Sequence, residues 1–129
     1  MITAVTLKFK YAGKGGSLPF NTHGKLLADV KQGSFNDNLA LELADFKVAA
    51  SKNAVLSFTN TLDVSGFYSQ SFAASNFQYI NRNGPTQFKL RFAKDDNNDF
   101  GADYLKIYSG GSIPGTQPEL VIGYTYYVR

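Results

Sequence analysis

The chain has 129 residues and a formal net charge of +3, and 43% of its residues are hydrophobic, 15% aromatic and 18% charged. This length supports one folded domain, and the composition excludes an intrinsically disordered protein. The absence of cysteine excludes disulfides, thiol nucleophiles and zinc sites built on cysteine.

The first half of the chain is predicted to form strands separated by irregular segments. Residues 5–11 alternate apolar and polar side chains, which is the period of a strand with one buried face. Residues 13–25 contain several glycines and Pro19, so we predict a loop. Residues 25–33 alternate again, whereas residues 34–51 fit either a short helix or an irregular crossing.

The second half continues the same pattern. Residues 54–72 are predicted to form two short strands with a turn that includes Gly66, and residues 73–85 a single helical turn that Ser75 opens as its cap. Three further strands are expected at 86–93, 104–110 and 119–129. Many short strands with little helix indicate an all-β fold, an antiparallel β-sandwich of the jelly-roll type with one or two short helical turns.

An acidic cluster lies between the strands predicted at 86–93 and 104–110. Calcium prefers hard oxygen ligands, and this cluster offers a candidate set: Asp95, Asn97, Asp99 and Asp103. An EF-hand is excluded, because its sixth and twelfth positions would be Phe100 and Lys106. The alternative is a polar turn in which Asp and Asn side chains bond their own backbone, and it needs no ion. We favour the turn, and calcium is the only candidate cofactor.

No enzyme signature is visible. His23 is the only histidine, and its neighbours offer neither a nucleophile nor an orienting acid. A glycosidase needs two carboxylates in different environments across a cleft, and the only glutamates are Glu42 and Glu119. We therefore expect a non-catalytic protein.

The strand at 104–110 carries the candidate ligand-binding residues. Tyr104, Lys106 and Tyr108 share one face, opposite to Leu105 and Ile107. An aromatic ring can pack against the apolar face of a sugar while polar groups bond its hydroxyls, so a polysaccharide is the candidate partner. The alternative is that this face is the core side, or that its rings only pack over neighbouring strands.

Binding of nucleic acid and insertion into a membrane are not expected. Basic residues are scattered along the chain, and Lys89 and Arg91 face away from the apolar side chains of their own strand. Rings and charges would then not share one face, as a single-strand platform requires. No apolar run reaches about 18 residues, the length of a spanning helix.

Five segments, taken in order, resemble a known bacterial module. They are GSF at 33–35, DF followed by AAS at 45–51, INRNGPTQFKLRF at 80–92, DDNNDFGADYLKIYSG at 95–110, and the final PELVIGYTYYV. The sequence resembles the DNRLRE-type jelly-roll modules of large exported and cell-surface proteins of bacteria, with the early amino-terminal strands missing. The resemblance implies an extracellular or cell-surface accessory or adhesion module, similar in architecture to carbohydrate-binding modules. A purely structural spacer is the alternative function.

The sequence also bears on the context of the domain. It begins inside a strand pattern and shows no signal peptide. We therefore expect residues 1–129 to be a single domain and a fragment of a larger multidomain protein. An exposed sheet edge would favour self-association.

Overall fold

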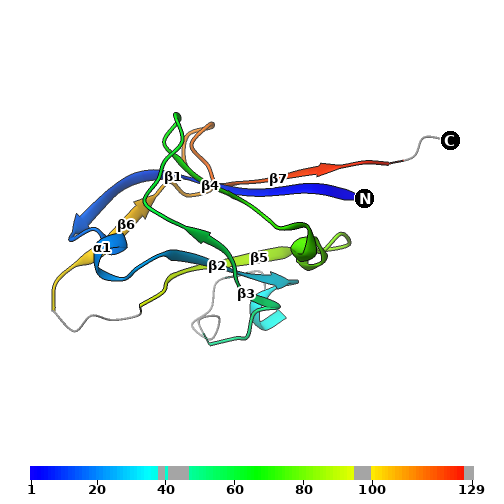
Figure 1. The fold of residues 1–129 in the computed structure, drawn as a ribbon, viewed down its shortest axis with the longest axis horizontal. Helices are drawn as coiled ribbons and strands as arrows, with labels where there is room; N and C mark the ends of the chain where they lie inside the picture. Colours follow the sequence, from blue (N-terminus) through cyan, green and yellow to red (C-terminus); the bar gives the residue numbers. More distant parts are fainter. Residues whose placement is uncertain (38–39, 41–46, 95–99, 127–129) are drawn as a thin grey trace.

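A computed structural model describes residues 1–37, 40, 47–94 and 100–126 of the chain, and two antiparallel sheets pack face to face in it (Figure 1). The first sheet consists of β1 (Ile2–Gly16), β4 (Phe67–Ser71), β6 (Asp103–Ile107) and β7 (Glu119–Tyr124). The second sheet consists of β2 (Leu26–Gln32), β3 (Lys52–Phe58) and β5 (Thr86–Phe92). Within the described residues, three short helices accompany them: α1 (Pro19–Thr22) and the 3₁₀ helices η1 (Phe35–Asp37) and η3 (Ala74–Tyr79). The predicted all-β antiparallel sandwich with few short helices is confirmed.

The long strand β1 organises the first sheet. Along one edge it pairs with β4, and along the other it pairs first with β7 and then, beyond a bulge, with β6. In the second sheet β2 lies between β3 and β5. The chain passes from one sheet to the other after β1, β3, β4 and β5, as it does in jelly-roll sandwiches.

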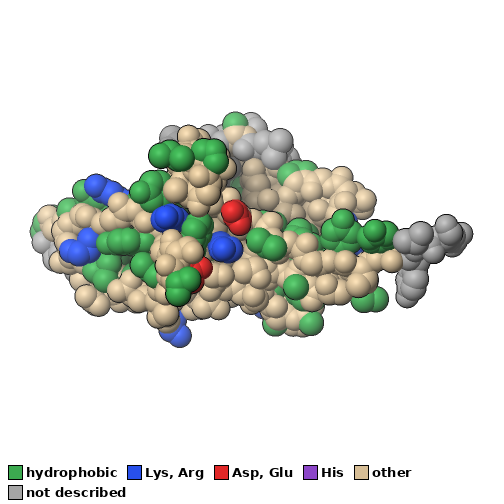
Figure 2. Space-filling model, turned by 90° about the horizontal axis from the view of Figure 1, so that it is seen from above, with side chains coloured by type: hydrophobic (Ala, Val, Ile, Leu, Met, Phe, Trp, Pro, Cys, Tyr) green, Lys and Arg blue, Asp and Glu red, His purple; other side chains and the backbone are tan. Residues whose placement is uncertain are grey.

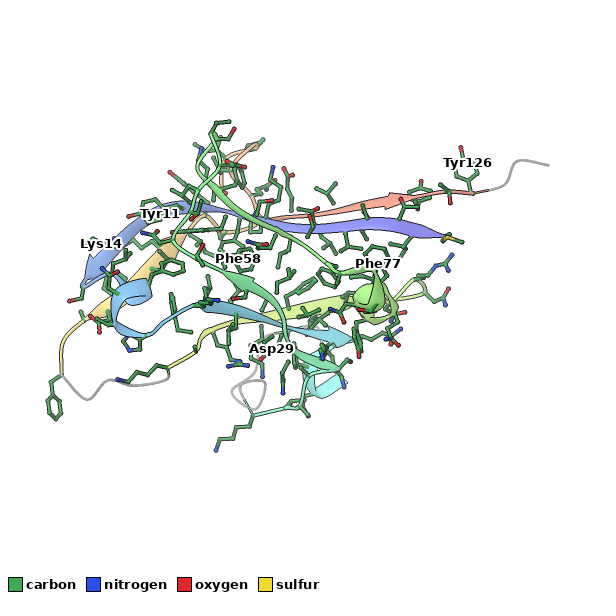
Figure 3. All side chains as sticks on the ribbon, viewed as in Figure 1. Tyr11, Lys14, Asp29, Phe58, Phe77 and Tyr126 are labelled. Atoms are coloured by element: carbon green, nitrogen blue, oxygen red, sulfur yellow. The ribbon has the colours of Figure 1, made fainter. Side chains whose placement is uncertain are left out.

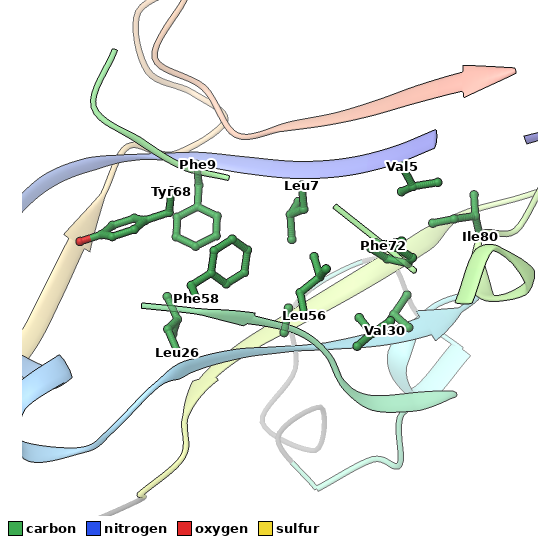
Figure 4. Packing of buried hydrophobic residues seen from close by; sticks show 12 residues of the cluster. Val5, Leu7, Phe9, Leu26, Val30, Leu56, Phe58, Tyr68, Phe72 and Ile80 are labelled. Carbon is green, nitrogen blue, oxygen red and sulfur yellow. The ribbon is translucent and has the colours of Figure 1, made fainter. Parts of the chain in front are cut away.

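The core lies between the sheets and follows the alternation of the strands. The apolar positions of β1, β2 and β3 point inward, and the buried set is Val5, Leu7, Phe9, Leu26, Ala28, Val30, Val55, Leu56 and Phe58. Rings dominate one end of it, where Phe9 lies 4.8 Å from Phe58 and 5.5 Å from Tyr68 between ring centroids (Figure 4). Such edge-to-face and tilted contacts stabilise beyond simple burial of area.

Two details of the predicted elements are wrong. The segment 13–25 was expected to be a loop, but β1 continues to Gly16 because the bulge at Gly13, with a φ of 129°, brings the next residues into register with β6. The turn at η3 begins after Ala73 without a side-chain cap, so Ser75 is not its cap. Of the segment 34–51, η1 is described, whereas residues 38–39 and 41–46 lie outside the described part of the chain.

Candidate functional site

The predicted ligand-binding residues of β6 lie on the outer face of the first sheet. Leu105 and Ile107 pack against the core, whereas Tyr104 is 49% and Tyr108 36% exposed. The alternative that this face is the core side is therefore wrong, whereas the alternative that its rings pack over a neighbouring strand holds for Tyr104, which packs over Gly15 of β1. By strand geometry the two tyrosines are about 13 Å apart along the chain, with Lys106 between them.

The far end of the Tyr104 ring lies over the backbone of β1. Tyr104 pairs with Gly15, and a Cβ atom at Gly15 would collide with that end of the ring. About half of the residue stays accessible to solvent. The glycine at the paired position leaves the space that the end of the ring occupies.

Lysines share this outer face with the rings. The Nζ atom of Lys106 lies 5.7 Å from the ring centroid of Tyr104. On β1, the Nζ atoms of Lys8 and Lys10 lie 4.7 and 5.8 Å from the ring centroid of Phe67. These are cation–π distances. Figure 2 shows Lys and Arg side chains spread over the left and middle of this view, and mainly hydrophobic and uncharged surface towards the carboxyl end.

This arrangement corrects one expectation from the sequence. Lys89 and Arg91 do face away from Phe88, Leu90 and Phe92, but on the first sheet cations and rings share one face. The rings near the lysines come from other strands, so alternation within one strand could not reveal them.

The outer face of the second sheet is occupied instead by an ion pair. The Nε atom of Arg91 donates to Oδ2 of Asp29 at 2.8 Å, and the backbone N–H of Ala54 donates to Oδ1 at 2.7 Å. Asp29 is only 3% exposed. Burial alone would raise the pKa of Asp29, but the hydrogen bonds from Arg91 and Ala54 and the charges of Arg91 and Lys89 hold it below its ordinary value.

Next to this ion pair, the side chain of Lys89 also contacts other parts of the protein. Its Nζ atom lies 4.7 Å from the ring centroid of Phe35 and 3.2 Å from the carbonyl oxygen of Val48. Through these contacts the ammonium group of Lys89 packs against η1 and residue 48.

The structure addresses only one of the four candidate calcium ligands. Asp95, Asn97 and Asp99 lie outside the described residues. Asp103 is at the start of β6, its side chain is 5% exposed, and its Oδ2 atom lies 3.7 Å from Nδ1 of His23. Within the described ranges, no group of three or more His, Asp or Glu side chains could hold a metal ion.

His23 is not an ordinary surface histidine, because its side chain is 12% exposed. Its Nδ1 atom contacts both the hydroxyl of Thr22, at 2.7 Å, and the carboxylate of Asp103. A catalytic triad needs the nucleophile at one ring nitrogen and the acid at the other. This group does not have that geometry.

A concave surface lies at the end of the sandwich where the chain begins. It is a cleft of about 610 Å³, lined by Met1, Ile2, Ile80, Asn81, Arg82, Ile122, Tyr124, Thr125 and Tyr126. Alternation along a strand places Ile122, Tyr124 and Tyr126 on one face, and they are 36%, 66% and 74% exposed. Tyr126 stands clear of the sandwich (Figure 3). A strand pattern shows that residues share a face, but not whether anything covers it.

Comparisons with known proteins add no assignment. No protein-family model, curated protein or solved structure matches the chain. The resemblance to DNRLRE-type modules therefore stays a prediction from the sequence. None of the described helices is long and apolar enough to cross a membrane.

Proposed function

We propose that this domain is a non-catalytic accessory or adhesion module of an exported bacterial surface protein, and that it binds a polysaccharide through the outer face of its first sheet. The observation that carries the proposal is the half-exposed ring of Tyr104, whose far end lies over Gly15. A sugar ring can stack on that open face, because an aromatic surface favours the apolar side of a pyranose.

The charge around the ring favours an acidic polysaccharide. Lys106 lies beside Tyr104, and the Nζ atoms of Lys8 and Lys10 lie near the Phe67 ring on the neighbouring strand pair of the same sheet. Ammonium groups next to an aromatic platform can pair with carboxylate or sulfate groups on a sugar chain.

The proposal is tested by affinity gel electrophoresis against a panel of neutral and acidic polysaccharides. An acidic polysaccharide should retard the wild-type domain, and Tyr104→Ala should weaken retention about tenfold, which corresponds to about 1.4 kcal/mol. Tyr126→Ala is the matched control, because it removes an even more exposed tyrosine at the other end of the molecule.

Three outcomes would contradict the proposal. If no polysaccharide retards the wild-type domain, a structural spacer is the better description. If Tyr126→Ala abolishes retention and Tyr104→Ala does not, the ligand binds at the terminal cleft. Tight and salt-sensitive retention of single-stranded DNA would favour a nucleic-acid platform, since the lysines and rings share one face.

A further inference from the structure

β7 is an exposed edge strand with apolar side chains on both faces. Its only partner among the described strands is β1. Val121 on one face is 50% exposed, and Ile122 and Tyr124 on the other face are 36% and 66% exposed. From residue 119 to residue 126 the only charged side chain is that of Glu119.

The other edge strands carry features that discourage pairing with another chain. β4 and β6 have five residues each, β5 carries Lys89 and Arg91, and β3 contains a bulge opposite β2. Short strands, inserted charges and bulges are the usual protections of a sheet edge. β7 has no Lys, Arg or Pro, and the extra residue in its pairing with β1 belongs to β1.

The position of β7 in the fold also leaves it without support. Figure 1 shows β7 and the start of β1 projecting together beyond the end of the second sheet. A ribbon of two strands is marginally stable in water, and a third strand with an apolar face stabilises it.

The hydrogen bonds between Met1 and Thr125 show which backbone groups of β7 point to its free edge. Thr125 uses both backbone groups towards Met1: its N–H donates to the Met1 carbonyl oxygen at 2.8 Å, and its carbonyl oxygen accepts from the Met1 amine at 2.6 Å. Successive residues of a strand direct these groups alternately to its two edges. The N–H and C=O groups of Leu120, Ile122 and Tyr124 therefore point to the free edge.

We infer that β7 pairs antiparallel with β7 of a second copy of this chain, across a two-fold axis at Ile122. In this register Ile122 lies opposite the partner's Ile122, and Leu120 lies opposite the partner's Tyr124. All of these residues direct their backbone groups to the free edge, so each pair is a hydrogen-bonded pair. Glu119 falls opposite the partner's Thr125, so no like charges meet.

The size of the interface fits a reversible dimer. The exposed side chains are Val121, Ile122, Tyr124 and Tyr126, and covering them in both copies would bury on the order of 800 Å² in total. This area is below the roughly 1,200 to 2,000 Å² of stable specific interfaces and is in the range of weak, transient ones. The dimer should therefore form and dissociate with concentration rather than be permanent.

The dimer is tested by sedimentation velocity at protein concentrations from about 1 μM to about 1 mM. The average mass of the wild-type domain should rise from that of a monomer towards twice that value. Ile122→Lys places two ammonium groups opposite each other at the axis and should keep the domain monomeric. Ile113→Lys is the matched control, because Ile113 is 73% exposed in the β6–β7 connection, and it should associate like the wild type.

A cross-linking experiment tests the register and does not depend on the folding of the lysine variant. The chain has no cysteine, and Cα atoms of a hydrogen-bonded antiparallel pair are about 5.5 Å apart, within the range of a disulfide. Ile122→Cys should form a covalent dimer under mild oxidation, and Ile113→Cys should not. A wild-type domain that stays monomeric up to about 1 mM, dimers that persist in Ile122→Lys, or equal cross-linking of the two cysteine variants would each overturn the inference.

Discussion

The outer faces of the two sheets carry basic strands of similar sequence pattern but differ in what covers them. On the second sheet Arg91 binds the buried carboxylate of Asp29, and Lys89 contacts Phe35 and Val48. On the first sheet Lys106 lies beside the half-exposed ring of Tyr104. The polar side chains of one face thus contact the protein, whereas the ring of Tyr104 on the other face stays half-exposed.

A polar face of a strand can therefore be buried rather than exposed to solvent. Asp29 is 3% exposed although it lies on the side of β2 away from the core. Substitutions on the second sheet should therefore change stability, whereas substitutions on the first sheet should change binding.

Asp29→Ala should lower the free energy of unfolding by about 2 to 3 kcal/mol. The substitution removes the acceptor of the Ala54 N–H and the partner of Arg91 at once. Urea unfolding measures the change, with Tyr104→Ala as the comparison on the other sheet, which should change stability by less than about 0.5 kcal/mol. Equal effects of the two substitutions would remove the distinction between the faces.

The stabilisation from Asp29 should depend on pH. Since the folded state holds the pKa of Asp29 below its ordinary value, its contribution is fully present above the unfolded pKa of about 3.9 and is lost as the pH falls through the folded pKa. The difference in stability between the wild type and Asp29→Asn should be constant above about pH 5 and shrink below about pH 4. A difference that grows towards acid pH would contradict the ion pair.

Gly15→Ala should change stability by about 1 kcal/mol or less, because the new Cβ displaces only the end of a flexible ring. It should nevertheless weaken polysaccharide retention as much as Tyr104→Ala does, since the ring must leave its place over residue 15. Gly16→Ala is the control: its Cβ would collide with the backbone oxygen of Ala102, and Gly16 has a φ of 64°. That variant should lose more stability than Gly15→Ala in the same unfolding experiment.

Lys106→Ala should have the smallest effect on stability, less than about 0.5 kcal/mol, because a cation beside an exposed ring contributes little in water. Retention by an acidic polysaccharide should fall, whereas retention by a neutral one should not. Affinity gels with both polymers measure the difference. Equal losses for both polymers would show that Lys106 acts through the position of Tyr104 rather than through its charge.

Much of the fold could be predicted from the sequence, because the alternation of apolar side chains is local. The strands at β2, β5 and β6 and the inward direction of Leu105 and Ile107 followed from a period of two. The extension of β1 to Gly16 did not, since it depends on pairing with β6, which is about 90 residues away in the chain.

The candidate site also combines features that a local pattern predicts with features that depend on contacts between distant residues. Strand alternation predicted that Tyr104, Lys106 and Tyr108 share a face, because successive side chains of a strand point to opposite sides. The pairing of the strands was needed to show that this face is the outer one, that Gly15 lies beneath the end of the Tyr104 ring, and that Arg91 on β5 binds Asp29 on β2. Residues distant in sequence cover a face, and a local pattern holds no information about them. The same holds for β7, whose apolar faces the sequence revealed and whose open edge only the pairing of the strands exposed.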